Sequence, residues 1–192
     1  MARPVTRPRE ADYFVGQIEE AVRLQDPTRI CRGVKSALKD LASEGASWIP
    51  DDYMVGSSES YSRRILHRCP EGSYSVMLMV WRPGQGTSIH DHAGKWCVEC
   101  VVRGEVEVVS YHLKGRQGDL HQFEERDTQR TEVGDVGVLI PPNEYHRLAN
   151  VSDQTAATIH VYEGELLWCN TFLPTDTRGT FRRERCTLTC DD

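Results

Sequence analysis

Residues 81–104 read W-R-P-G-Q-G-T-S-I-H-D-H-A-G-K-W-C-V-E-C-V-V-R-G, and this stretch decides the fold. His90 and His92 stand two residues apart, so on an extended strand both side chains point to the same face. Their neutral imidazoles can then converge on one ion, and imidazole is the commonest metal ligand in proteins. The glycines at 84 and 86 predict a turn before this strand. The run C-V-E-C-V-V predicts a second strand, and Arg103-Gly104 predicts a hairpin end before the alternation resumes.

Short apolar or alternating runs continue through most of the chain from Tyr61 onward, with turn signals between them. The expected strands lie within Tyr61–Arg68, Tyr74–Trp81, Trp96–Val102, Glu105–Tyr111, Arg130–Val133, Asp135–Ile140, His146–Val151 and Ala156–Tyr162. The polar, glycine-containing segment Leu113–Arg130 is expected to be a long hairpin loop. So many short strands at near-regular spacing predict an all-β sandwich or barrel.

Ahead of the strands, the sequence predicts amphipathic helices. Apolar residues follow helical spacing over residues 10–24. Asp26-Pro27 then supplies an N-cap and a proline at the first position of a second helix, which Gly45 ends. We therefore expect residues 1–45 to be a helical segment packed on a barrel of residues 46–192, with one structural domain overall.

Composition and charge restrict the classes of partner. The chain has 192 residues and a formal net charge of −6, which argues against nucleic acid or an anionic membrane as a main partner. The N-terminus lacks the apolar region of a signal peptide, and no run approaches the roughly 18 apolar residues of a membrane-spanning helix. The seven cysteines form an odd set without a repeating framework: Cys31, Cys69, Cys97, Cys100, Cys169, Cys186 and Cys190. We therefore expect a cytoplasmic monomer with reduced thiols.

The spacing of the histidine stretch, G-x5-H-x-H-x4-C-x6-G, resembles the first cupin motif, with Cys97 where many cupins have a glutamate. The stretch G-D-V-G-V-L-I-P-P-N-E-Y-H-R-L-A-N, residues 134–150, resembles the second cupin motif and places His146 and Asn150 at its histidine and asparagine. It has one extra residue before Pro141, and Asn143 stands in the glycine position, where asparagine tolerates a positive φ. The resemblance implies a cupin jelly-roll barrel in which His146 is the third metal ligand.

Three neutral histidines leave the double positive charge of a metal ion uncompensated, whereas the usual non-haem iron triad includes one anionic ligand. Such a site favours an anionic ligand such as a thiolate, because a coordinating thiol is deprotonated. Open coordination positions remain for substrate and dioxygen. This ligand set permits thiol oxidation and does not select it over zinc or manganese chemistry.

From about Trp48 to Phe172 the chain resembles the cysteine dioxygenases, and this likeness implies Fe(II) held by the three histidines. The Y-x-R motif of that family is matched by Tyr61-Ser62-Arg63. By resemblance, Arg63 holds the carboxylate of the substrate, because a planar guanidinium fits a carboxylate in two contacts. Cys169 matches a cysteine of the family's substrate pocket, and it is equally well explained as a small buried apolar residue.

A second motif of that family, S-x-H-x-Y, is matched by Thr158, His160 and Tyr162. Alternation places the three side chains on one face of a strand, which is costly in a core unless they hydrogen-bond one another or line a cavity. The resemblance implies that Thr158 orients His160 and that His160 orients the Tyr162 hydroxyl toward the reacting atoms. It also pairs Cys97 with Tyr162 in a thioether cross-link, a covalent change that a sequence does not display.

The resemblance implies an iron-dependent dioxygenase that adds both atoms of O2 to the sulfur of L-cysteine, giving cysteine sulfinic acid. Arg63 favours an α-amino acid thiol, because the related 3-mercaptopropionate dioxygenases lack arginine at this position. Glu163-Gly164 stands where the family commonly has Ser-Pro, so we expect a carboxylate near the amine end of the substrate. The alternatives are a dioxygenase of another small thiol (3-mercaptopropionate, mercaptosuccinate or cysteamine) and a cupin that binds metal without turnover.

Overall fold

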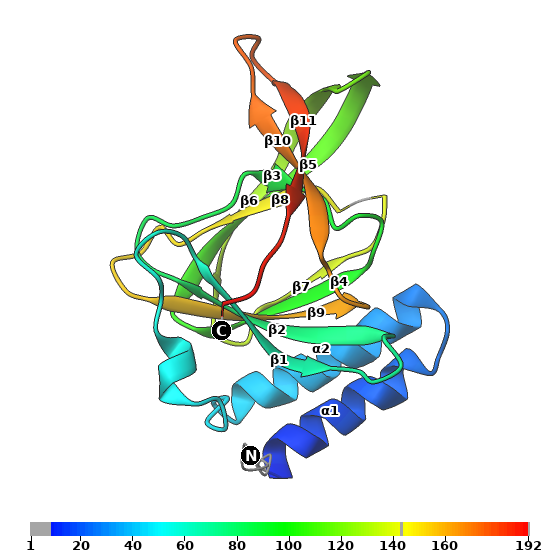
Figure 1. Cartoon of the computed structure of the whole chain (residues 1–192), viewed down its shortest axis with the longest axis vertical. Coiled ribbons are helices and arrows are strands. Elements are labelled where there is room, and N and C mark those ends of the chain that lie inside the picture. The colour runs from blue at the N-terminus through cyan, green and yellow to red at the C-terminus, as the bar shows by residue number, and fades with distance from the viewer. Residues whose placement is uncertain (1–8, 143, 192) are drawn as a thin grey trace.

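The computed structural model describes residues 9–142 and 144–191, and Asn143 with its expected positive φ lies outside them. Figure 1 shows the helices along one side of a stack of strands, with the long hairpins at the opposite end. The helical elements are α1 (Arg9–Val22), α2 (Pro27–Ser43) and the short 3-10 helix η1 (Asp51–Met54). The strands are β1 (Ser62–Arg68), β2 (Tyr74–Trp81), β3 (Ile89–His90), β4 (Cys97–Arg103), β5 (Glu105–Gln117), β6 (Leu120–Glu132), β7 (Val136–Leu139), β8 (His146–Ala149), β9 (Ala156–Glu163), β10 (Trp168–Pro174) and β11 (Thr180–Thr187).

The expected helices are confirmed, and local capping explains where the second one begins. Asp26 has an extended backbone and accepts a hydrogen bond from the Arg29 N–H, while Pro27 occupies the first helical position. Gly45 follows the end of α2 with φ +78°, a conformation that favours glycine. Within the described residues, no helix combines the length and the apolarity needed to span a membrane.

Replacing Asp26 with alanine is expected to lower the free energy of unfolding by about 1 kcal/mol, because the first turn of α2 loses its cap. The lost contact is the 2.9 Å hydrogen bond from Arg29 N to Asp26 Oδ1. Asp26→Asn keeps an acceptor and serves as the matched control in urea unfolding. Equal losses in the two variants would show that the acceptor is not what stabilises this end of the helix.

The first sheet has the strand order β1-β2-β9-β4-β7 and is antiparallel throughout. Its two faces are both buried, since every residue of β2 is buried. One face packs on the helices through residues such as Leu78 and Ile159 against Leu38. The other face, including Met77 and Tyr162, lines the barrel interior. The helices thus cover one face of the sheet, and the division into a segment of residues 1–45 and a barrel of residues 46–192 within one domain stays a prediction.

The second sheet runs β10-β11-β6-β5-β8-β3 and closes on itself where β3 pairs with β10. The loop expected over Leu113–Arg130 is wrong, because β5 and β6 are paired strands of 13 residues each that turn at Gly118. The outer half of this hairpin extends beyond the barrel, so polar side chains occupy both faces and the apolar alternation disappears. The segment Arg130–Val133, expected as a separate strand, supplies the end of β6.

The hairpin expected at Arg103-Gly104 is also wrong. β4 pairs with β7 and β9, whereas β5 pairs with β6 and β8, so this turn carries the chain from one sheet to the other. Gly104 has φ +67°, and a Cβ here would lie 3.0 Å from the carbonyl oxygen of Thr155. The turn residue was therefore recognised correctly and the strand partner was not.

Candidate metal centre

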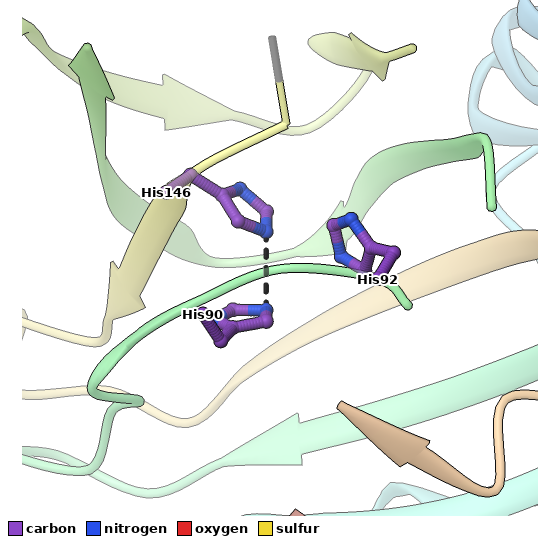
Figure 2. A group of neighbouring side chains, drawn as sticks. All are labelled: His90, His92 and His146. Carbon is purple, nitrogen blue, oxygen red and sulfur yellow. Dashed lines mark hydrogen bonds between the residues drawn. The ribbon is translucent and has the colours of Figure 1, made fainter. Parts of the chain in front are cut away.

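Three histidines converge at the junction of β3 and β8, and Figure 2 shows their rings gathered around a common centre. His90 lies in β3 and pairs across the sheet with His146, the first residue of β8. The sequence predicts one extended strand through both histidines, but β3 ends at His90 and His92 lies beyond it. The ring centroids of His90 and His146 are 4.5 Å apart, and those of His92 lie 5.2 and 5.0 Å from them. The arrangement brings one nitrogen of each ring within 4.8 Å of the others.

The hydrogen bonds of His90 determine which nitrogen faces the centre. Its Nδ1 lies 3.1 Å from the carbonyl oxygen of Ser88, which can only accept, so Nδ1 carries the proton and Nε2 keeps its lone pair. Burial and the neighbouring His146 lower the pKa of His90 to about 3, so this ring is neutral at pH 7. Its Nε2 faces the Nε2 of His146 at 3.2 Å, the dashed line in Figure 2.

A bound cation fits these atoms. His92 is 1% exposed, and its Nε2 has no hydrogen-bond partner within the described structure. An unpaired buried nitrogen costs free energy, and a metal ion shared by the three imidazoles removes that cost. The site thus meets the chemical requirement for a three-histidine metal centre.

Two buried carboxylates beside the histidines were not anticipated from the sequence. Glu144 Oε2 accepts a hydrogen bond from the backbone N–H of His92 at 3.1 Å and lies 3.9 Å from its Nδ1. Burial raises the pKa of Glu144 to about 7. Glu99 Oε1 lies 3.5 Å from Nδ1 of His146. The expectation of an uncompensated metal charge therefore needs correction, because negative charge is available beside the ligands.

The pKa of Glu99 is shifted in the opposite direction to that of Glu144. Burial opposes ionisation, yet the rings of His146 and His160 hold the pKa of this carboxyl well below its usual range. A signal was present in the sequence, since one acidic residue interrupts the apolar run C-V-E-C-V-V on the same strand face as Cys97. Its ring partners come from distant strands, which the run does not reveal.

A cavity of about 170 Å³ opens beside His90. This volume is below the roughly 300–1,000 Å³ of pockets for drug-sized ligands, so it suits a small molecule. Its lining includes the three residues assigned to substrate binding, namely Tyr61, Arg63 and Cys169, together with His160 and Tyr162. Leu166 and the C-terminal Leu188 also line it and were not anticipated.

Arg63 is 6% exposed and has one free side of its guanidinium. Nη1 donates to the Thr189 carbonyl oxygen at 2.9 Å, whereas Nη2 is buried with no hydrogen-bond partner among the described residues. Tyr61 stacks on Trp81 with ring centroids 4.4 Å apart and forms a wall of the cavity. Burial, followed by the nearby Cys186, raises the pKa of Cys169 to about 12, so its thiol is neutral.

The trio on β9 lies on one buried face, as alternation predicted. Thr158 Oγ1 lies 2.8 Å from Nε2 of His160 and accepts from the Trp81 indole N–H at 2.9 Å. The second expected link, from His160 to the Tyr162 hydroxyl, differs from what the structure shows. The rings of His160 and Tyr162 stack at 5.8 Å, and Nδ1 of His160 faces Glu99 at 3.3 Å.

Cys97 and Tyr162 are direct partners across the antiparallel pair β4–β9, which places their side chains side by side on the inner face. Burial, then the charge of Glu99, raises the pKa of Cys97 well above its usual range. Burial, then Cys97, does the same for the pKa of Tyr162. Both groups are therefore protonated near neutral pH. All seven cysteines are free thiols in the structure.

The carboxylate expected near the substrate amine is not in the cavity. Glu163 is exposed and accepts from the backbone N–H of Trp96 at 3.4 Å. Glu165 pairs with Arg68 at 3.0 Å on the surface. The chain turns at Gly164, with φ +64°, and neither carboxylate lines the cavity.

The closed β-structure with histidines gathered inside it is that of a cupin. The chain belongs to the cysteine dioxygenase type I family, whose model matches residues 14–174. Similar relatives are the cysteine dioxygenases type 1 of Rattus norvegicus, 24% identical over 141 residues, and of Homo sapiens, 22% identical over the same length. Each alignment covers 72% of this chain and 68% of the relative.

The solved structures to which this chain is similar have low sequence identity to it and TM-scores below 0.5. A Klebsiella pneumoniae protein with a double-stranded β-helix domain gives a TM-score of 0.45 at 20% identity, covering 60% of this chain and 88% of its own. A cupin 2 conserved barrel protein from Salinispora arenicola gives a TM-score of 0.43 at 20% identity, covering 59% and 85%. Family membership assigns the chain to the thiol dioxygenases of cupin fold.

Proposed function

We propose that this protein is an iron-dependent dioxygenase that converts L-cysteine and O2 to cysteine sulfinic acid. The observation that carries the proposal is the three-histidine cluster beside a small cavity into which Arg63 turns an unpaired, buried N–H group. Both oxygen atoms end on sulfur, and the sulfur supplies all the electrons that O2 takes up, so the reaction needs no other reductant.

His90, His92 and His146 would hold the Fe(II), which supplies a binding position for the thiolate and O2 and activates the O2. Arg63 would bind the carboxylate of the substrate with Nη2 while Nη1 stays on Thr189. Among the described residues that line the cavity none is a carboxylate, so a bound Fe(II) would offer the substrate amine a binding position. Arg63 thus favours thiols with a carboxylate over cysteamine.

Tyr162 would donate a hydrogen bond to oxygen atoms as charge develops on them. Its phenol keeps the proton that it would donate, because burial and Cys97 raise its pKa well above the usual range. Thr158 and His160 form the wall behind it, and the stacked rings of His160 and Tyr162 hold the phenol in place. Cys97 lies opposite Tyr162 and would tie the phenol further through a thioether.

The proposal is tested with Fe(II)-loaded protein, an oxygen electrode and mass analysis of the products. L-Cysteine, 3-mercaptopropionate, mercaptosuccinate and cysteamine are compared at equal concentration. We expect O2 uptake with cysteine to exceed that with the others and the product to gain two oxygen atoms. Preferential oxidation of another thiol would show that cysteine is not the preferred substrate. No O2 uptake with any thiol would instead identify a cupin that binds metal without turnover.

The purified, iron-exposed protein is expected to have a mass lower than the sequence mass by two hydrogen atoms, which O2 removes as the Cys97 sulfur bonds to the Tyr162 ring. Cys97→Ser is expected to have the full mass calculated from its own sequence, with no hydrogen atoms missing. Its kcat should fall by less than the ~100-fold contributed by a positioned acid or base, since the phenol remains. Cys100→Ser, which removes a buried thiol on the helix-covered face, is the control and should keep the lower mass.

A further inference from the structure

Glu99 is a buried carboxylate for which the proposed substrate and metal contacts give no reason. It follows Cys97 by two residues on β4, so both side chains point into the barrel, and it is 5% exposed. Among the described residues its ion-pair contacts are with histidine rings. Oε1 lies 3.5 Å from Nδ1 of His146, and Oε2 lies 3.3 Å from Nδ1 of His160. Burying a carboxylate costs several kcal/mol unless its partners compensate it.

The opposite strand leaves room for this side chain. Gly137 on β7 is the cross-strand partner of Glu99. A Cβ at residue 137 would lie 3.1 Å from both Cγ and Oε1 of Glu99, closer than ordinary van der Waals contact. The absence of a side chain at Gly137 therefore gives the Glu99 carboxylate room, and a Cβ there would push against it.

The hydrogen bonds of His160 direct one of its protons at Glu99. The Trp81 indole N–H can only donate, and Thr158 Oγ1 accepts it at 2.9 Å. The Thr158 hydroxyl proton is then available to Nε2 of His160 at 2.8 Å. A neutral imidazole that accepts at Nε2 carries its proton on Nδ1, which is the atom facing Glu99.

The same reasoning applies to His146. Its Nε2 faces the Nε2 of His90 in the cluster, so its lone pair is needed there. The ring proton must then sit on Nδ1, toward Glu99 Oε1. One carboxylate thus faces the Nδ1 atoms of two rings, one in the metal cluster and one in the wall of the substrate cavity.

We propose that Glu99 is a positioning residue that fixes the orientation and tautomer of His146 and His160 together. This role deepens the proposed function. It rests on that function in one respect, because it takes the three-histidine cluster to be the metal site. Carboxylates that hold metal-binding histidines in this way raise ligand basicity. Glu99 therefore couples the affinity for the ion to the geometry of the Thr158–His160–Tyr162 wall.

The test measures Fe(II) and Zn(II) affinity by anaerobic competition with a chromophoric chelator, without thiol or O2. Glu99→Gln is expected to bind both ions 10- to 100-fold more weakly, the usual effect of losing such a partner. In the Zn(II)-loaded protein, the ring nitrogens of His160 should show protonated Nδ1 by 15N NMR, and Glu99→Gln should lose this single tautomer. The matched control is Glu107→Gln, a barrel carboxylate whose ion-pair partner is Arg147, with affinity unchanged within about 2-fold.

Gly137→Ala keeps the Glu99 carboxylate and displaces its side chain. This variant takes the place of Glu99→Gln in the test if Glu99→Gln does not fold. We expect its metal affinity to fall by roughly 3- to 10-fold, less than the loss expected when the carboxylate itself is removed.

A folded Glu99→Gln protein with unchanged metal affinity and an unchanged His160 tautomer would overturn the proposed role. Two ions per wild-type chain and one per Glu99→Gln chain would also overturn it, making Glu99 a ligand of a second ion. An inactive wild type that binds the ion would refute the proposed function alone, whereas one that binds neither ion would refute both.

Discussion

Replacing His146 with alanine is expected to abolish Fe(II) binding and to lower kcat/KM for cysteine by more than about 100-fold. The loss should exceed the 10- to 100-fold effect of removing a partner of a ligand, because a ligand itself is removed. The side chain is 1% exposed and pairs with His90 at the junction of β3 and β8. The measurements are iron content after anaerobic loading and steady-state O2 uptake.

Thermal unfolding separates loss of the ion from loss of the fold. A ligand that binds only the native state raises its stability, so Fe(II) should raise the Tm of the wild type and leave that of His146→Ala unchanged. His121→Ala is the control, because it also removes a buried histidine ring, which packs on Phe172 and is not one of the three clustered histidines. Iron retained by His146→Ala at wild-type affinity would contradict the assignment of this ligand.

Replacing Arg63 with alanine is expected to lower kcat/KM for cysteine by roughly 10- to 150-fold. The range corresponds to the roughly 1.5–3 kcal/mol of a hydrogen bond to a charged group. Cysteamine has no carboxylate, so its slower oxidation should change less than about 3-fold. Arg63→Lys keeps the charge and loses the planar fork, and we expect an intermediate value.

The adjacent Arg64→Ala variant is the matched control for Arg63. Arg64 follows on the same strand, and its Nη1 donates to the Tyr53 carbonyl oxygen at 2.9 Å instead of facing the cavity. Its removal should leave both substrates unaffected. An equal loss for cysteine and cysteamine in Arg63→Ala would mean that Arg63 acts through the Thr189 contact, as a structural residue, and not through the substrate carboxylate.

The elements that the sequence predicted well are those governed by nearest neighbours. The Asp26-Pro27 cap sets the start of α2, because the capping bond spans only three residues. The strands β2, β4 and β9 have short apolar or alternating runs bounded by turn signals, which favour strands. The elements that it missed, including β10 and β11, lie largely at the projecting end of the molecule in Figure 1. Polar residues occupy both faces of β11 and of the outer β5–β6 hairpin, and the apolar residues of β10 do not alternate, so periodicity carries no signal.

The residues of the candidate site likewise fall into two groups, those that a short motif predicts and those that it does not. His90 and His92 lie in one short motif, and motif spacing added His146, so the cluster was foreseeable before any coordinates. The partners of those rings were not. Glu99 was read as an ordinary strand residue, and Glu163 was expected near the substrate amine that it does not approach.

The class of fold, the helical segment and the three histidines are predictable without coordinates, because each depends on residues close together or on a fixed motif spacing. Three features become visible only in the folded chain: which oxygen each ring faces, the passage from β4 into a different sheet, and the contact of the C-terminal Thr189 with Arg63. These features depend on strand register. Contacts such as Glu99 to His160 join residues whose distance depends on how whole strands align, and no short segment encodes that alignment.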